Sequence, residues 1–456
     1  MKKVLAEKTS IEFLKGSETK ISRRSVLSSL GLAVSAAAAA GAGFTASMEK
    51  ALAVTGETGY VKPGRWYELG IIGDDYLDAQ LLRQLEAVWH GMGDIGEVLD
   101  TANRVQPGNP QSWFKAWYET AEQIHGVAKK SEQAGHRVSA GEAYLRASNY
   151  YRGSEWFDHD NDAAQRHTDS FQKAIRLLDM PITPVEIPYE GTTLPGYFFK
   201  AQGVKRKAPL VIAHSGFDGT TEEMKFVGEG ASKRGYHALL FSGPGQALVI
   251  RKQGLPFRHD WEKVVGPVID FALQQPDIDE SRIGLAGVSF GGFLAPRAAA
   301  FEDRLKVLVA NPGALNFYRL AAEYFGKDNL VLLERDPGLF DEIIYRRMAE
   351  SIRAQMAMGD AMLKFGAKTP AELPSLMKPF DNTGIVQKIK CNTLIMDSEE
   401  ETVNADEAMA LYNALQCPKD YMLFDKRSTG SLHCQTGALA ISNQRMFDWL
   451  DDNLKA

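Results

Sequence analysis

Short apolar runs alternate with stretches of helical periodicity over the second half of the chain, and this alternation constrains the fold more than any other feature. The runs occupy residues 210–213, 238–241, 283–286, 307–310, 393–396 and 421–424. Buried runs of this length separated by helical segments are typical of a mostly parallel sheet with helices on both faces. Two more runs, 185–188 and 194–199, flank residues 189–191 and predict a β-hairpin. The expected fold class is therefore α/β.

Two other stretches have helical rather than strand periodicity. In residues 64–178 the apolar positions recur at spacings of three and four. Ser139 and Glu142 have the spacing of a capping box, which predicts a helix that starts at Ser139. Residues 317–384 are also mostly helical in pattern, and an insertion of this size beside a sheet is most simply a lid. The predicted parts are a helical N-terminal part at 54–180, an α/β core at 181–316 and 385–456, and a helical lid insertion at 317–384.

The first 53 residues resemble an export signal rather than part of a fold. Arg23 and Arg24 precede a weakly apolar run at 30–43, and residues 51–53 offer small side chains to a signal peptidase. This pattern is typical of a twin-arginine signal, so we expect a periplasmic or secreted protein. The alternative, an N-terminal membrane anchor, is weaker because a span needs about 20 strongly apolar residues. We expect no stable membrane span in the mature chain.

Composition narrows the choice of partners. The chain has 58 acidic and 52 basic side chains and a formal net charge of −6. This negative charge argues against nucleic acid as a binding partner. Cys391, Cys417 and Cys434 are the three cysteines, and their spacing supports neither a disulfide framework nor a zinc site. We expect no metal and no cofactor. The expected partner is a small-molecule substrate, and a homodimer is compatible with the sequence.

Residues 287–291 read Gly-Val-Ser-Phe-Gly and carry the candidate nucleophile, Ser289. This motif follows the predicted strand at 283–286 and opens a helical run at 293–300. A serine on a tight strand-to-helix turn presents its hydroxyl above the sheet, and flanking glycines allow strained dihedrals and close packing. The bare motif also occurs by chance, and a structural turn serine is the alternative.

A serine hydroxyl needs a base, and only one of the nine histidines, His433, follows Ser289 in the chain. The order nucleophile, acid, histidine then places the acid after the run at 393–396, where Asp397, Glu399, Glu400 and Glu401 compete. Glu401 is the first choice because a turn must bring the acid back over the sheet, and Asp397 is the alternative. We expect the remaining carboxylates to be solvated.

The oxyanion formed on attack needs hydrogen-bond donors. The backbone N–H of Phe290 follows the nucleophile directly, and the loop after residues 210–213 offers that of Phe217. His214 in the same loop is better explained by packing. Asp218 is a candidate substrate-binding residue, with a bystander turn residue as the alternative.

Six segments together resemble one known group of enzymes. They are SAGEAYLRASNYYR (139–152), HSGFDGTTEE (214–223), GPGQ (243–246), DWE (260–262), RIGLAGVSFGGFLAPRAA (282–299) and HCQ (433–435). The chain resembles the α/β-hydrolases with a helical N-terminal cap, the group that contains 2,6-dihydroxypseudooxynicotine hydrolase, a fungal heptaketide hydrolase of the melanin pathway and the fermentation-respiration switch protein.

This resemblance implies an α/β-hydrolase fold with a helical N-terminal cap and a helical lid insertion. It implies a triad of Ser289, the Glu401 position and His433, with Asp218 where relatives carry an acidic residue near the substrate. Relatives usually have Asp at the Glu401 position. They also have Asp-Gly-Pro-Gly-Gln-Gly where this chain reads Ser-Gly-Pro-Gly-Gln-Ala at 242–247.

The predicted function is that of an exported serine hydrolase working through an acyl-enzyme. The resemblance implies hydrolysis of an ester or of a carbon–carbon bond beside a ketone. Aromatic and methionine side chains in residues 317–365 suggest an apolar or aromatic small molecule as substrate. The alternatives are a non-catalytic binding protein with this fold and a peptidase-type acyl hydrolase.

Overall fold

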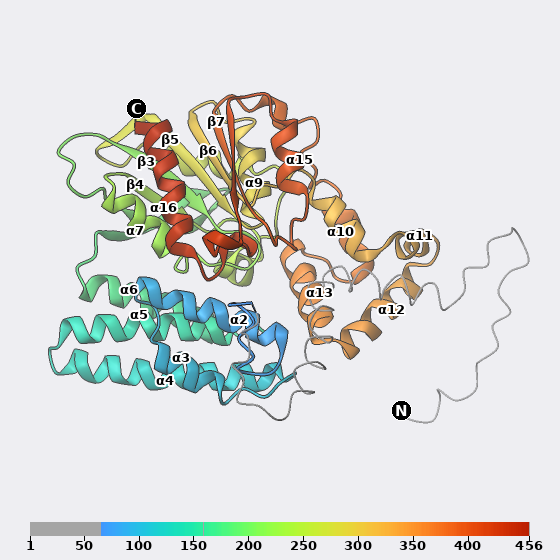
Figure 1. Cartoon of the computed structure of the whole chain (residues 1–456), viewed down its shortest axis with the longest axis horizontal. Helices are drawn as coiled ribbons and strands as arrows, with labels where there is room; N and C mark the ends of the chain where they lie inside the picture. The colour runs from blue at the N-terminus through green and yellow to red at the C-terminus, as the bar shows by residue number, and fades with distance from the viewer. Residues whose placement is uncertain (1–64, 158, 456) are drawn as a thin grey trace, which may run out of the picture.

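The computed structural model describes residues 65–157 and 159–455. The predicted export signal lies outside these residues. Figure 1 shows a layer of N-terminal helices packed below an open sheet, with a second group of helices beside both.

An eight-stranded sheet forms the centre of the molecule, with strand order β1-β2-β4-β3-β5-β6-β7-β8. Strands β3 to β8 are parallel, and β2 pairs antiparallel with both β1 and β4. All six predicted apolar runs lie in strands of this parallel part, so the predicted α/β fold class is confirmed. The strands are β1 (Ile182–Tyr189), β2 (Thr192–Phe199), β3 (Ala208–His214), β4 (His237–Phe241), β5 (Ile278–Val288), β6 (Leu305–Asn311), β7 (Asn392–Ser398) and β8 (Lys419–Phe424).

The predicted hairpin is also present, because β1 and β2 are joined by two residues only. Glu190 and Gly191 have φ values of 40° and 83°. Two positive φ values in a two-residue connection give the turn whose twist matches that of paired strands.

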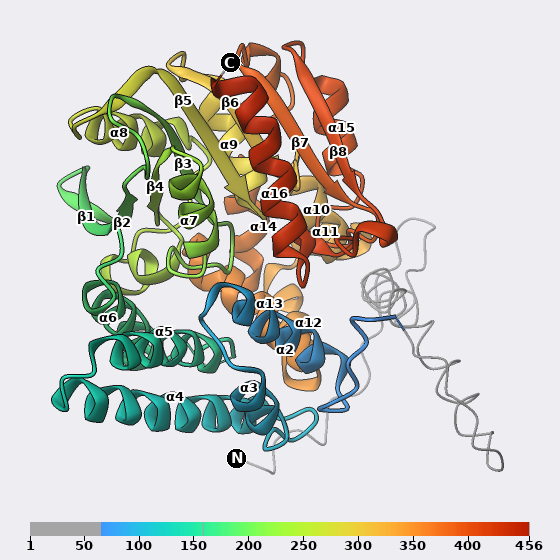
Figure 2. The same ribbon diagram turned by 60° about the vertical axis from the view of Figure 1, so that its left-hand side comes forward.

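Helices cover both faces of the sheet, as the apolar runs predict (Figure 2). Along β3, Val211 and Ala213 pack in one apolar cluster with α7 (Lys225–Lys233) and α16 (Leu439–Leu450). The alternate residues Leu210 and Ile212 pack in a second cluster on the opposite face. The helices of that second face are α8 (Glu262–Ala272), α9 (Gly291–Ala299) and α15 (Glu407–Ala414). Because successive strand residues point to opposite faces, a strand covered on both sides must be apolar throughout.

The N-terminal helices form a layer of their own. They are α2 (Asp75–Glu86), α3 (Ile95–Ala102), α4 (Pro110–Gln133), α5 (Arg137–Ser154) and α6 (Asn161–Leu177). Asp74, Asp94 and Asn109 accept hydrogen bonds from first-turn N–H groups and so begin α2, α3 and α4. The predicted start of a helix at Ser139 is wrong. Gly135, with φ of 80°, turns the chain after α4, so that α5 already begins at Arg137 and Ser139 lies inside its first turn.

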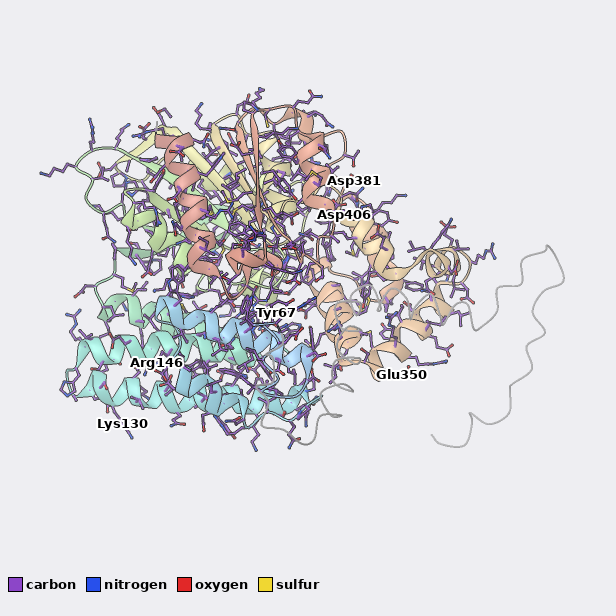
Figure 3. The ribbon with its side chains drawn as sticks, viewed as in Figure 1. Tyr67, Lys130, Arg146, Glu350, Asp381 and Asp406 are labelled. Atoms are coloured by element: carbon purple, nitrogen blue, oxygen red, sulfur yellow. The ribbon has the colours of Figure 1, made fainter. Side chains whose placement is uncertain are left out.

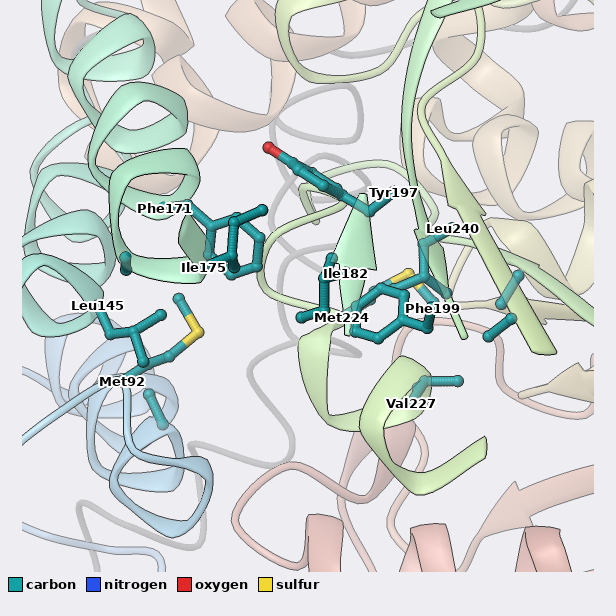
Figure 4. Close-up of a cluster of buried hydrophobic side chains, with 14 of the residues drawn as sticks. Met92, Leu145, Phe171, Ile175, Ile182, Tyr197, Phe199, Met224, Val227 and Leu240 are labelled. Carbon is teal, nitrogen blue, oxygen red and sulfur yellow. The ribbon is translucent and has the colours of Figure 1, made fainter. Parts of the chain in front are cut away.

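One continuous apolar cluster joins these helices to the sheet (Figure 4). Phe171 and Ile175 of α6 and Leu145 of α5 contribute from the helical layer. Tyr197 and Phe199 of β2 contribute from the sheet. Buried aromatic and aliphatic side chains of this size stabilise an interface by about 1.5–3 kcal/mol each. The N-terminal helices are therefore packed against the core and share its interior.

A helical insertion separates β6 from β7, as predicted. Its helices are α10 (Phe317–Phe325), α11 (Lys327–Arg335), α12 (Pro337–Glu350), α13 (Ile352–Phe365) and α14 (Leu373–Met377). The end of α13 is marked by Gly366 in the left-handed conformation, with φ of 73°. Among the helices of residues 65–157 and 159–455, none has the length and apolarity to cross a membrane.

Candidate active site

The turn between β5 and α9 carries Ser289. Its φ of 60° lies in the left-handed region, which a residue with a side chain adopts only where its surroundings hold it there. A Cβ on Gly287 would lie 2.0 Å from the carbonyl oxygen of Gly291, so only glycine lets the strand and the helix approach this closely. The motif therefore forms the strained strand-to-helix turn that its sequence predicts, with Ser289 at its apex.

His433 lies against Ser289 although 144 residues separate them. Its Nε2 is 2.9 Å from Ser289 Oγ, and its Nδ1 is 2.8 Å from Glu401 Oε2 and 2.9 Å from Oε1. An ionised carboxylate can only accept, so Nδ1 carries the proton that it donates to Glu401. In the neutral ring, Nε2 is then left to accept a hydrogen bond from the Ser289 hydroxyl. The three side chains form one continuous line of hydrogen bonds.

Glu401 is fixed from both sides of its carboxylate. Besides His433, it accepts hydrogen bonds from the backbone N–H groups of Val403 at 2.7 Å and Asn404 at 3.0 Å. Only 5% of its side chain is exposed. Burial alone would raise the pKa of Glu401, but the His433 ring and the backbone N–H groups lower it below its ordinary value. Glu401 is thus held in the ionised form that orients an imidazole.

The alternative acid, Asp397, points elsewhere. It is the sixth residue of β7, and it accepts a hydrogen bond of 2.5 Å from the hydroxyl of Tyr421 on β8. Burial raises the pKa of Asp397. Within the described part of the chain, Glu401 and not Asp397 contacts His433.

The charge state of His433 follows from the same contacts. Burial lowers the pKa of the ring, and the neighbouring Cys434 and the Glu401 carboxylate raise it by more. The pKa of His433 therefore lies above its ordinary value of 6.5. The neutral ring, which is the form that can take a proton from Ser289, becomes populated only as the pH rises.

The backbone N–H groups of Phe290 and Phe217 lie beside this line. Across residues 65–157 and 159–455, neither N–H has an acceptor in the protein. A Cβ on Gly216 would lie 2.3 Å from the amide nitrogen of Phe290, so the loop after β3 passes directly over the nucleophile turn. Gln246 holds this loop by donating to the carbonyl oxygens of Ser215 at 2.6 Å and Gly216 at 3.1 Å. Among the described residues, the N–H of Phe290 is thus unpaired next to Ser289, and Phe217 follows the residue that touches this turn.

His214 and Asp218 occupy different surroundings within that loop. His214 is fully buried, donates from Nδ1 to the Ser215 carbonyl oxygen at 2.9 Å and accepts from Trp261 at 3.2 Å. Burial lowers its pKa to about 4, so it is neutral and serves packing, as the sequence favours. The carboxylate of Asp218 lies 3.2 Å from the ammonium of Lys364 on α13 and borders a cleft.

The cleft lies where the N-terminal helices, the core and the insertion meet. The end of α5 contributes Arg152 and its C-cap residue Glu155, the loop after β3 contributes Phe217 and Asp218, and α13 contributes Lys364. Phe217 belongs both to the cleft and to the surroundings of Ser289.

Phenylalanine rings surround the residue that follows the nucleophile. The ring of Phe290 lies 4.2 Å from that of Phe317 on α10, measured between centroids, and 6.2 Å from that of Phe365 on α13. Phe257 and Phe380 lie 5.0 and 5.8 Å from the same ring. The helical insertion therefore contributes Phe317 and Phe365 to an apolar cluster packed around Phe290, the residue after the candidate nucleophile.

Three residues of this region were not identified from the sequence. Glu400 was expected to be solvated and is not: its carboxylate accepts from Ser431 Oγ at 2.7 Å and from the Tyr67 hydroxyl at 2.9 Å. Gln246 lies inside the GPGQ segment, which contributed to the family resemblance but did not indicate what the Gln246 side chain contacts. No pattern pointed to Lys364, because its position depends on how α13 packs. The described residues contain no group of His, Cys, Asp and Glu side chains that could hold a metal ion.

The fold and these contacts define an α/β hydrolase, and comparisons with known proteins agree. Hydrolase LUC6 from Fusarium sp is 34% identical over 409 residues, covering 84% of this chain and 97% of that protein. The 20-hydroxy-prefusarin hydrolase FUS2 from Gibberella moniliformis is 33% identical over 408 residues, covering 84% and 97%. The chain belongs to the α/β-hydrolase family, and its relatives are hydrolases. No protein-family model matches it.

Solved structures share the fold. The crystal structure of 2,6-dihydroxy-pseudo-oxynicotine hydrolase covers 82% of this chain with a TM-score of 0.64 and 22% identity, and 95% of that chain is matched. AbyA5 covers 83% with a TM-score of 0.57 and 16% identity, with 98% of that chain matched. These two similarities show that the fold is that of an α/β hydrolase.

Proposed function

We propose that this protein is an exported serine hydrolase whose triad is Ser289, His433 and Glu401. The observation that carries the proposal is the unbroken line of hydrogen bonds from Ser289 Oγ through both ring nitrogens of His433 to Glu401. A hydroxyl, a base and an acid in this order are what nucleophilic catalysis requires.

In the proposed reaction, Nε2 of His433 takes the hydroxyl proton while Ser289 Oγ attacks the substrate carbonyl carbon. The resulting oxyanion accepts hydrogen bonds from the N–H groups of Phe290 and Phe217. Collapse of this intermediate expels the leaving group, to which His433 returns the proton. Water then attacks the acyl-enzyme with His433 again as base, and Ser289 is regenerated.

The proposed substrate is an apolar or aromatic small molecule with an ester or a carbon–carbon bond beside a ketone. The aromatic cluster of Phe290, Phe317 and Phe365 beside the nucleophile supports an apolar acyl or aryl group, with the half-buried Phe317 as its accessible member. One relative is named a 20-hydroxy-prefusarin hydrolase, which supports a small organic molecule as the kind of substrate to test. Asp218 would contact the polar end of such a substrate, since it borders the cleft.

The test is turnover by the purified protein on aryl esters and on acylated phenolic ketones. Ser289→Ala should lower turnover by about a thousandfold or more while circular dichroism and melting temperature stay near wild type. Turnover of neither substrate set would favour a binding protein that keeps the fold without catalysis. Cleavage of peptide substrates instead would favour a peptidase-type acyl hydrolase.

Export rests on the arginine pair Arg23-Arg24 and the weakly apolar run that follows it. We propose that the mature protein works in the periplasm or outside the cell.

A further inference from the structure

The first described residues lie against the loop that carries the triad acid. The hydroxyl of Tyr67 donates to Glu400 Oε2 at 2.9 Å, and the guanidinium of Arg65 lies 3.0 Å from Glu400 Oε1. Figure 3 labels Tyr67 where the N-terminal helices meet the C-terminal part of the core. Glu400 immediately precedes Glu401, so this contact acts next to the acid.

Glu400 also joins two loops. One is the acid loop, residues 399–406, which carries Glu401, and the other is the histidine loop, residues 425–438, which carries His433. Its carboxylate accepts from Ser431 Oγ at 2.7 Å, and its backbone N–H donates to the Ser431 carbonyl oxygen at 2.8 Å. Ser431 is buried and lies two residues before His433. The ammonium of Lys426 lies 3.5 Å from the same Glu400 carboxylate. Tyr67 therefore binds Glu400, the residue that connects both loops.

The end of α2 makes a second contact, on the far side of His433. Glu86, the last residue of α2, accepts a hydrogen bond of 2.6 Å from the backbone N–H of Gly437. The ring of Trp66 packs directly on Gly437, where a Cβ would lie 2.6 Å from Trp66 Cη2. The histidine loop is thus held at Ser431 on one side and at Gly437 on the other.

This loop needs external support because its backbone is strained. Cys434 and Gln435, which follow His433, have φ values of 54° and 56°. Residues with side chains persist in the left-handed region only where their surroundings hold them. Catalytic groups must be held within about 0.5 Å of their working geometry.

We propose that Tyr67 and Glu86 are positioning residues that hold the His433 imidazole against Ser289 and Glu401. Through them the N-terminal helical part takes part in catalysis without touching the reacting atoms. This inference rests on the triad proposed above. It goes further, because it assigns a catalytic consequence to contacts of the N-terminal part with the histidine loop.

The test compares variants that remove single contacts. Tyr67→Phe removes only the hydroxyl. Glu86→Leu removes the acceptor for Gly437, whereas Glu86→Gln keeps an oxygen that can accept the same N–H. Tyr118→Phe is the matched control, because the Tyr118 hydroxyl donates to Asp162 at 2.8 Å in the helical part, on an exposed surface.

Two readouts separate positioning from folding. We expect Tyr67→Phe and Glu86→Leu to lower kcat, and the rate of Ser289 labelling by a fluorophosphonate, about tenfold with KM little changed. Glu86→Gln and Tyr118→Phe should stay near wild type. We also expect the downfield proton resonance of His433 Nδ1–H, identified by its loss in His433→Ala, to shift or broaden in Tyr67→Phe and not in Tyr118→Phe.

Wild-type labelling rates and an unchanged resonance in Tyr67→Phe and Glu86→Leu would overturn the proposal. So would a loss of rate that only follows the unfolded fraction measured by circular dichroism. If the wild type is not labelled at Ser289, the serine mechanism fails, and the resonance alone then decides whether Tyr67 positions His433.

Discussion

At the scale of single residues, His433 decides when the proposed site is active. The ring is held between a hydroxyl and an ionised carboxylate, and its pKa lies above 6.5. A base must be unprotonated to work, so kcat/KM should rise with pH through this raised pKa and reach its plateau on the alkaline side. The dependence of kcat/KM on pH measures this pKa. An acid limb centred below pH 6 would contradict the predicted charge state of His433.

The choice between two carboxylates gives the second prediction. Glu401→Gln should lower kcat by about a thousandfold with little change in KM, because an amide cannot stabilise the imidazolium and can hold the ring in the wrong tautomer. Asp397→Asn should be mild, since Asp397 bonds Tyr421 rather than His433. Steady-state kinetics on both single variants and on the double variant decide which carboxylate is the triad acid. A severe Asp397→Asn beside a near-normal Glu401→Gln would move the role to Asp397.

The sequence identifies some of these site residues and not others, and the difference has physical reasons. Ser289 and His433 follow from a local motif and from chain order. For the acid, the sequence ranks Glu401 first and leaves Asp397 as the alternative, because the sequence does not fix where β7 ends. Since β7 extends to Ser398, the strand fixes the direction of Asp397, whereas Glu401 follows the strand and can turn back. Glu400 was misjudged because its partners Tyr67 and Ser431 are distant in sequence.

At the scale of elements, the site depends on the loop after β3 lying on the turn between β5 and α9. Gly216→Ala should lower kcat by about a hundredfold or more, because the new Cβ would push the loop off Phe290 and displace its free N–H. Gly126→Ala is the matched control: Gly126 is inside α4, with no atom near its Cβ position, and the change should stabilise the fold by about 0.5–1 kcal/mol. Normal turnover by a folded Gly216→Ala would contradict the assigned oxyanion donors.

Elements differ in how far periodicity predicts them. The strands of the parallel sheet were predictable because both faces are buried, which forces continuous apolar runs. The start of α5 was not, since the turn at Gly135 rather than the spacing of Ser139 and Glu142 sets it. The insertion could be predicted as helical, but its contact with the site through Phe317 and Lys364 depends on packing that no local pattern records.

At the scale of the whole molecule, the N-terminal helices, the core and the insertion converge on one cleft. Lys364 of the insertion pairs with Asp218 of the core and with Asp360 one turn earlier on α13. His159, which follows α5, contacts Asp360 as well. The cleft is therefore assembled from segments that are far apart in the chain.

Export is a property of the whole chain, and its prediction concerns the N-terminal segment. Exchanging both Arg23 and Arg24 for Lys should keep the protein in the cytoplasm in its longer form, because the export machinery reads the arginine pair while the charge is unchanged. Cell fractionation and the mass of the protein in each fraction measure this. Undiminished appearance of a shortened form outside the cytoplasm would contradict a twin-arginine signal.

The central claim is that Ser289 is the nucleophile, and covalent labelling tests it most directly. The purified protein would be treated with a fluorophosphonate, and the modified residue located by mass spectrometry of its peptides. We predict one adduct per chain, on Ser289, formed faster as the pH rises through the raised pKa of His433 and absent in Ser289→Ala. An unlabelled wild type, or an adduct that persists in Ser289→Ala, would contradict the account.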